Sequence, residues 1–187
     1  MMPAIIERHT FTVDEYHRMA ETGILTENDR VELINGEIIA MSPINSPHAG
    51  HVKRINAFFT RLFGAKVVIS VQDPLAVGNI SEPEPDVMLL KPRDDFYANA
   101  HPQPNDVYLL IEVADSSLKL DRKVKLPLYA SAGVPEVWIV NLTDQQVEVY
   151  RTLTEGQYKS KEIARGKQEI TVPHFMLSIT AQDLLGK

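Results

Sequence analysis

Apolar and polar positions follow two different periods along this chain, and the period of each segment predicts its secondary structure. Apolar residues recur every three or four positions in 12–21 and 46–63, which predicts two amphipathic helices. Thr12 and Glu15 have the spacing of a capping box at the start of the first helix. Short apolar runs bounded by turn-forming residues predict strands over 30–34, 37–41, 67–71, 85–90, 107–114, 136–141 and 146–152.

A tight β-hairpin is expected around Asn35-Gly36, because both central residues of such a turn need a positive φ that these two residue types tolerate. A two-residue loop would set Glu32 opposite Ile39. Glu32 is therefore an acid on a strand that otherwise looks central.

The remaining segments predict connections and a second hairpin. Residues 91–106 hold three prolines and should be irregular. Residues 157–163 and 169–172 suggest a further hairpin, and 180–185 a last short helix.

A further helix should run towards Ala132 and end at a glycine. Three of its residues are four apart and share one face: Asp121, Lys125 and Tyr129. Pro127 lies inside this span and cannot donate a backbone hydrogen bond. Either the helix begins near Val124, with Pro127 in its first turn, or it is kinked at Pro127. Both alternatives keep the lysine near the end of the strand 107–114.

Hairpins mixed with helices between strands predict an α/β (α+β mixed) fold, with a central mixed β-sheet flanked by helices and additional β-hairpins. We find no repeat or linker, so residues 1–187 are expected to form one domain. No apolar stretch approaches the roughly 20 residues that cross a bilayer, and the start lacks a secretion signal. We therefore expect a cytoplasmic protein with no membrane partner.

Composition restricts the chemistry. The chain has no cysteine, which excludes disulfides, thiolate nucleophiles and cysteine-ligated metals. Its formal charge of −6 permits a local basic patch but argues against tight non-specific DNA binding.

Two acids on apolar strands are the main candidates for chemistry. Asp86 precedes the run 87–90, and Glu112 lies within the strand 107–114, on the same face as Leu110. An ionised carboxylate in such a place is costly unless something compensates it. On adjacent strands, about 4.8 Å apart, the two acids can reach one cation between them. Oxygen ligands favour magnesium, and Lys125 would add a positive charge beside a water or phosphate. In the alternative, Asp86 caps a turn and Glu112 pairs with Lys125 or an arginine.

An ordered set of motifs between about Thr10 and Tyr150 resembles the PD-(D/E)XK nuclease superfamily, and within it the restriction-endonuclease-like family of small bacterial proteins. The matching segments are Val31 to Glu37, Met41-Ser42-Pro43 with His48, Ser81 to Val87, Ile111-Glu112-Val113 with Ser116-Ser117, Asp121 to Tyr129, and Gly133 to Trp138.

The resemblance implies a restriction-endonuclease-like core in which Asp86 and Glu112 hold a divalent ion. The backbone carbonyl of Val113 would be a further ligand. The implied cofactor is Mg2+, with Mn2+ as the alternative.

The resemblance also implies a lysine and a further acid. The strand motif would place the lysine at residue 114, where this chain has Ala114. The lysine is implied to have moved to the following helix, where Lys125 fits, with Tyr129 four residues on; Lys123 is the alternative. Glu32 matches an acid that an earlier element supplies to help hold the metal or its waters.

These residues lead us to expect a magnesium-dependent endonuclease that acts on DNA as a homodimer. Lys125, with Glu32, would position the attacking water. Two alternatives remain open: a non-catalytic module that binds nucleic acid or protein, and a metal hydrolase that acts on smaller phosphoesters.

Other residues have simpler interpretations. His48 is expected to be a satisfied helix-start histidine, and Glu82 and Glu84 to lie in a solvated loop. Gln72 could reach the site from a neighbouring strand. Further candidates are the helix cations that could line a cleft or simply face solvent (Lys53, Arg54 and Arg61) and the aromatic residues expected in the core (Trp138 and Tyr150).

Overall fold

The centre of the computed structural model, which describes residues 8–26 and 28–186, is a six-stranded mixed sheet. Its strands lie in the order β3 (Val68–Ser70), β4 (Val87–Leu90), β5 (Val107–Ala114), β6 (Val137–Asn141), β7 (Gln146–Thr154) and β8 (Gln157–Ala164). The pair β5–β6 is parallel, and the other neighbours in this sheet are antiparallel. The predicted mixed α/β fold is confirmed.

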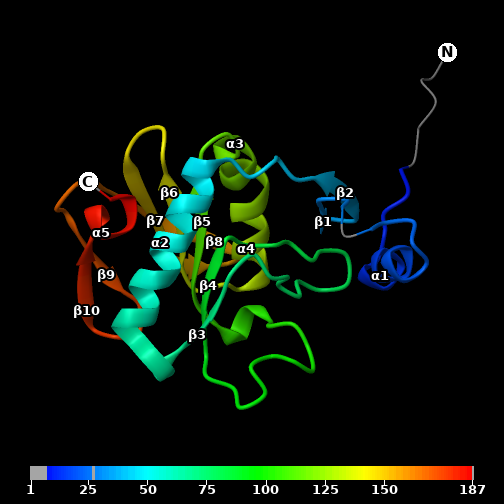
Figure 1. Cartoon of the computed structure of the whole chain (residues 1–187), viewed down its shortest axis with the longest axis horizontal. Coiled ribbons are helices and arrows are strands. Elements are labelled where there is room, and N and C mark those ends of the chain that lie inside the picture. Colours follow the sequence, from blue (N-terminus) through cyan, green and yellow to red (C-terminus); the bar gives the residue numbers. More distant parts are fainter. Residues whose placement is uncertain (1–7, 27, 187) are drawn as a thin grey trace.

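Helices cover both faces of this sheet (Figure 1). On one face, α2 (Ser46–Phe63) and α5 (Ala181–Leu185) pack on a core that includes Trp138. The other face is covered by a continuous helical segment, 118–132. This segment consists of α3 (Leu118–Leu120), a π-helical turn (Asp121–Lys125) and α4 (Leu126–Ala132). Trp138 and Tyr150 are buried as predicted.

The π-helical turn resolves the conflict around Pro127. The backbone N–H of Leu126 donates to the carbonyl of Asp121, five residues earlier, and Pro127 then lies in the first turn of α4. The wider turn changes which backbone carbonyl accepts the hydrogen bond at Leu126, directly before Pro127, which has no N–H to donate. The helical segment begins before Val124, so neither sequence alternative describes it fully.

A separate lobe contains α1 (Val13–Glu21) and the hairpin of β1 (Val31–Ile34) and β2 (Glu37–Ala40) (Figure 1). The capping box of α1 is present, and Glu32 pairs with Ile39 as predicted. The expectation that Glu32 lies on a central strand is wrong, because β1 and β2 form their own two-stranded sheet. A bridge from Leu33 to Glu82 connects this sheet to the loop before β4.

The predicted hairpin between 157–163 and 169–172 is also wrong. β8 pairs with β7 through a tight turn in which Glu155 and Gly156 both have positive φ. Instead, β9 (Glu169–Val172) pairs with β10 (Leu177–Thr180), a strand that the sequence analysis did not predict. Among the described residues, no helix has the length and apolar character needed to span a membrane.

Candidate active site

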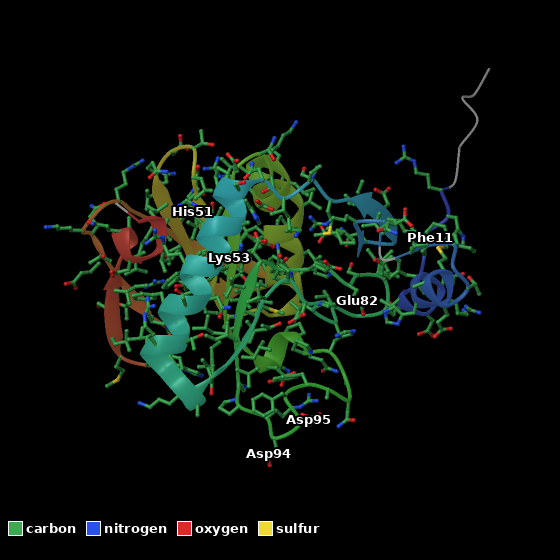
Figure 2. All side chains as sticks on the ribbon, viewed as in Figure 1. Phe11, His51, Lys53, Glu82, Asp94 and Asp95 are labelled. Carbon is green, nitrogen blue, oxygen red and sulfur yellow. The ribbon has the colours of Figure 1, made fainter. Side chains whose placement is uncertain are left out.

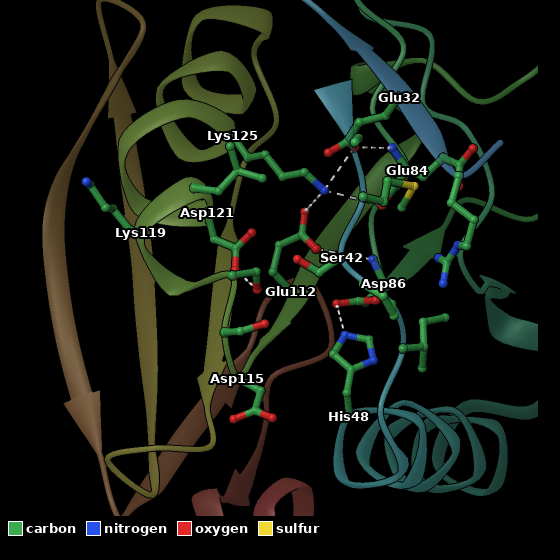
Figure 3. Close-up of a pocket in the computed structure, with 18 of the residues that line it drawn as sticks. Glu32, Ser42, His48, Glu84, Asp86, Glu112, Asp115, Lys119, Asp121 and Lys125 are labelled. Carbon is green, nitrogen blue, oxygen red and sulfur yellow. Dashed lines mark hydrogen bonds and ion pairs between the residues drawn. The ribbon is translucent and has the colours of Figure 1, made fainter. Parts of the chain in front are cut away.

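A cavity of about 500 Å3 opens where the β1–β2 hairpin, the start of α2, the beginning of β4 and the end of β5 meet the π-helical turn. Figure 3 shows the side chains that surround it. Its lining includes all four predicted site side chains, Glu32, Asp86, Glu112 and Lys125, together with His48, Glu84, Asp115 and Asp121.

Asp86 and Glu112 come together because β4 and β5 run antiparallel, with Val87 opposite Ile111. The backbone N–H of Asp86 donates to Oε2 of Glu112 at 3.3 Å. The N–H of Val113 donates to Oδ2 of Asp86 at 2.9 Å. The N–H and C=O of one strand residue project to the same edge, so the carbonyl of Val113 faces the β4 side as well. The two acids and this carbonyl therefore lie at one end of the sheet.

Lys125 reaches the same cluster from the π-helical turn. Its Nζ lies 3.0 Å from Oε2 of Glu32 and 3.4 Å from Oε1 of Glu112. Tyr129 donates a 2.6 Å hydrogen bond to the same Oε1. Lys123 also lines the cavity but is exposed, whereas Lys125 is buried. Of the two lysines that the sequence left open, Lys125 contacts the acids.

Glu32 enters the cluster from outside the central sheet. Its side chain is buried on β1, and Oε2 also accepts the backbone N–H of Glu84 at 3.1 Å. The hairpin lobe thus supplies one wall of the cavity and a carboxylate that fixes Lys125.

Asp86 has two further polar partners. Nε2 of His48 lies 3.1 Å from its Oδ2, and Gln72 donates to its Oδ1 at 3.2 Å. The hydrogen bond to Asp86 raises the pKa of His48, although burial opposes this. His48 lies in the first turn of α2 as predicted, with its backbone N–H capped by Asn45. The prediction of a satisfied histidine is wrong, because its buried Nδ1 has no hydrogen-bond partner among the described residues and its side chain faces the cavity (Figure 3). The interpretation of Gln72 as a neighbour of the site agrees with this contact.

The buried groups of the cavity include more acids than bases. Glu32, Glu112 and Asp121 are buried acids, and Lys125 is the buried base beside them. Burial raises the pKa of Glu112 to about 8, although Lys125 opposes this. Burial also raises the pKa of Asp121 to about 6, against the hydrogen bond from Ser117. Burial would lower the pKa of Lys125, but Glu112 and Glu32 outweigh it and the pKa is raised. A divalent cation bound here would compensate the carboxylates and so favour their ionised form.

The donor chemistry fits such a cation. Two carboxylates and a main-chain carbonyl are hard oxygen donors, and magnesium typically takes one or two protein carboxylates, completing its shell with waters and phosphate. Within residues 8–26 and 28–186, no group of three or more His, Cys, Asp or Glu side chains is arranged to hold a metal. The pair of Asp86 and Glu112 is therefore the candidate, and its role stays a prediction.

Several side chains lie elsewhere than the sequence suggested. Glu84 is half-buried in the cavity wall, and burial, with Glu32 nearby, raises its pKa. Glu82 is buried too, but it lies 2.7 Å from His17 of α1. The expected solvated loop is therefore wrong for both. The three α2 cations are exposed and lie outside the cavity lining: Lys53 (Figure 2), Arg54 and Arg61.

Sequence reasoning missed Asp121 as a site residue. Its spacing of four from Lys125 on a helix carried the signal, because residues four apart share a face. The apolar residues around it could also have indicated that this face is buried.

Comparisons with known proteins identify a family and a similar fold. A family model described as "Uma2: Putative restriction endonuclease" matches residues 13–182. The fold is similar to a crystal structure titled as a "putative nuclease belonging to DUF820" from Anabaena variabilis ATCC 29413, with a TM-score of 0.71. The two share 17% sequence identity over 94% of this chain and 97% of that chain, which supports the fold alone. No curated protein matches the chain.

Proposed function

The chain belongs to the Uma2 family of restriction-endonuclease-like proteins, and on this premise we propose that it is a metal-dependent endonuclease that hydrolyses phosphodiester bonds in DNA. The juxtaposition of Asp86, Glu112 and Lys125 in one cavity carries this proposal. The family description supports nuclease chemistry, and the excess of buried acids supports a divalent cation.

Asp86 and Glu112, with the carbonyl of Val113, would hold Mg2+, or Mn2+ in its place. When bound, such an ion polarises phosphoryl oxygens and lowers the pKa of a coordinated water. Tyr129 and Lys125 both contact Oε1 of Glu112. Because Oε1 is occupied, Oε2 is the oxygen that Glu112 presents towards Asp86.

Lys125 provides a fixed positive charge at the base of the cavity. The ammonium group is held by Glu32 and by the carbonyl of Glu84, at 3.0 and 3.5 Å. A positive charge that is already held in place in a buried site does not need to reorganise during the reaction. It can therefore stabilise the negative charge that develops on a phosphate. In this proposal Lys125 orients the attacking water or the scissile phosphate, and Glu32 orients Lys125.

A second candidate function is hydrolysis of smaller phosphoesters. Lys53, Arg54 and Arg61 do not line the cavity, and the chain carries a formal charge of −6. Both features reduce the basic footprint that a long DNA backbone needs. A non-catalytic binding module is the further alternative, and it predicts no effect of a divalent ion.

We also propose that the protein acts as a homodimer, because two cuts on a duplex suit a two-fold pair of sites. Sedimentation equilibrium across a concentration series tests this separately from catalysis. A monomer at all concentrations would remove this part of the proposal.

Cleavage assays test the function. Plasmid DNA and a short phosphodiester are each incubated with wild type, Asp86→Asn and Glu112→Gln, in Mg2+, in Mn2+ and with EDTA. Glu136→Gln is the matched control, because Glu136 is a buried strand-end glutamate outside the cavity lining. We expect the metal to support plasmid cleavage by wild type and the control, and both site variants to lose it. Activity only on the short diester would favour the second candidate. Plasmid cleavage by Asp86→Asn and Glu112→Gln at the wild-type rate would contradict the assignment of the site.

A further inference from the structure

A second buried carboxylate lies in the same row across the sheet as Glu112. Glu112 pairs with Ile139 of β6, and Ile139 pairs with Glu148 of β7. Directly paired residues project to the same face, so both glutamates face the helical segment 118–132. They are two strands apart, or about 10 Å.

Glu148 is fully buried and is held by donors from several elements. Arg122 of the π-helical turn donates through Nε at 3.1 Å and through Nη2, which makes a two-pronged contact. The other donors are Lys161 (3.1 Å), Tyr150 (2.7 Å), Gln146 (3.1 Å) and Asn141 (3.2 Å). Burial would raise the pKa of Glu148, but these hydrogen bonds, led by that from Arg122, hold it below its usual range. Glu148 is therefore a fixed anion that binds the turn.

Arg122 and Lys125 belong to the same five-residue turn and are anchored on opposite sides of it. Arg122 reaches Glu148 on β7, whereas Lys125 reaches Glu112 on β5 and Glu32 on β1. Residues three apart on an α-helix are neighbours on its surface. The hydrogen bond from Leu126 to Asp121, five residues back, widens this turn, and the two side chains reach different strands.

We propose that Glu148, acting through Arg122, is a positioning residue that sets the π-helical turn and thereby aims Lys125 into the active site. This role rests on the proposed function, because Lys125 is the group that the turn delivers. Lys125 has no room to compensate for a rotated turn, since its side chain is buried between two carboxylates.

Three variants test the proposal against a matched control. Arg122→Met removes the two-pronged guanidinium contact to Glu148 but leaves Glu148 its other donors. Because the side chain of Arg122 is partly exposed, this variant should destabilise the fold least. Glu148→Gln removes the negative charge of Glu148. Arg122→Lys keeps the positive charge at residue 122 but cannot make the two-pronged contact. Glu136→Gln is the control, because Glu136 is also a buried glutamate held by an arginine, Arg151, but its side-chain partners lie on β6 and β7.

The kinetic readout separates positioning from general destabilisation. At a temperature where all variants are folded, kcat for plasmid cleavage should fall about 10- to 100-fold in Arg122→Met and Glu148→Gln, because misplacing a reacting group by about 1 Å costs up to that much. KM should stay within about twofold, and Arg122→Lys should be intermediate. The control should keep the wild-type kcat. Wild-type kcat in both Arg122→Met and Glu148→Gln would overturn the proposal.

Amide hydrogen exchange provides a readout that does not need activity. Peptides that cover 120–128 should exchange faster in Arg122→Met and Glu148→Gln than in wild type or the control, because the turn loses its anchor. If wild type cleaves nothing, the proposed function fails while the exchange data still decide whether Glu148 sets the turn. Unchanged exchange in both variants would reject the positioning role.

Discussion

At the scale of single residues, one ammonium group stands between two carboxylates. Lys125 contacts Glu32 and Glu112, and Asp121 adds a third buried acid nearby. A buried ion pair stabilises a fold only when its geometry compensates for desolvation. An arrangement with more acids than bases is therefore costly, and that cost is the physical reason to regard the cluster as functional.

The hydroxyl of Tyr129 is one group whose removal should affect both stability and activity. Tyr129→Phe deletes the 2.6 Å hydrogen bond to Glu112 and should lower the free energy of unfolding by roughly 1–3 kcal/mol. Cleavage should fall as well, because Glu112 loses a contact that fixes its orientation. Urea unfolding and plasmid cleavage measure the two effects.

Tyr158→Phe is the matched control for Tyr129→Phe. In wild type, the hydroxyl of Tyr158 donates to the carbonyl of Val134 at 2.7 Å, outside the cavity lining. It should lose stability but keep activity. If Tyr129→Phe cleaved plasmid as well as Tyr158→Phe and wild type do, Tyr129 would contribute to stability only.

Glu148 should make stability depend on acid pH. Its folded-state pKa lies below the unfolded value of about 4.5, so its contribution is complete above that value and is lost as pH falls. Glu148→Gln should therefore cost roughly 3 kcal/mol near pH 7 and progressively less towards pH 3. Denaturant unfolding of wild type and variant across this range measures the difference. A cost that is independent of pH would show that the charge of Glu148 does not matter.

At the scale of elements, the hairpin β1–β2 places Glu32 against Lys125, and its turn leaves no space for a side chain at Gly36. Gly36 has a φ of +76°, and a Cβ there would lie 2.6 Å from Cβ of Thr10. Gly23 has the same φ, but nothing lies within 4 Å of its Cβ position.

These two glycines separate backbone strain from steric contact. Gly23→Ala should cost about 1–2 kcal/mol for the left-handed backbone alone. Gly36→Ala should cost roughly 1–3 kcal/mol more for the contact with Thr10. Gly36→Ala should also weaken cleavage, because the hairpin carries Glu32. Thermal unfolding and cleavage assays measure both effects, and equal destabilisation by the two variants would contradict the steric argument.

Local patterns predicted most elements, because each is determined by neighbours in sequence. The capping box, the Asn35-Gly36 turn and the alternation around Glu112 all depend on residues within a few positions. The position of β1 outside the central sheet depends on long-range pairing, about which periodicity carries no information. The partner of β8 is its neighbour in sequence, β7, and the turn at Glu155-Gly156 is a local signal that the expected hairpin between 157–163 and 169–172 overlooked.

The same distinction applies to the candidate site. Asp86 and Glu112 could be identified because acids are unusual on apolar strands. Asp121 carried only the weaker signal of its spacing from Lys125, and Glu84 carried none, because the burial of Glu84 results from elements that meet only in the folded chain. The π-helical turn was signalled only indirectly, by Pro127 within an otherwise helical pattern.

At the scale of the whole molecule, a cation that binds the folded state should raise its stability. A ligand at 100 times its Kd contributes about 2.7 kcal/mol, and a chain of this size gains roughly 2–4 °C in Tm for each kcal/mol. We therefore expect saturating Mg2+ or Mn2+ to raise the wild-type Tm by several degrees.

The location of that cation is tested by two Asp→Asn variants. Asp86→Asn removes a proposed ligand, whereas Asp144→Asn changes an acid outside the cavity lining. Differential scanning calorimetry with EDTA and with each metal should show the rise in Tm for wild type and Asp144→Asn but not for Asp86→Asn. An equal rise in all three would place the ion elsewhere, because a site that needs both strand acids cannot keep its affinity once one of them is neutral.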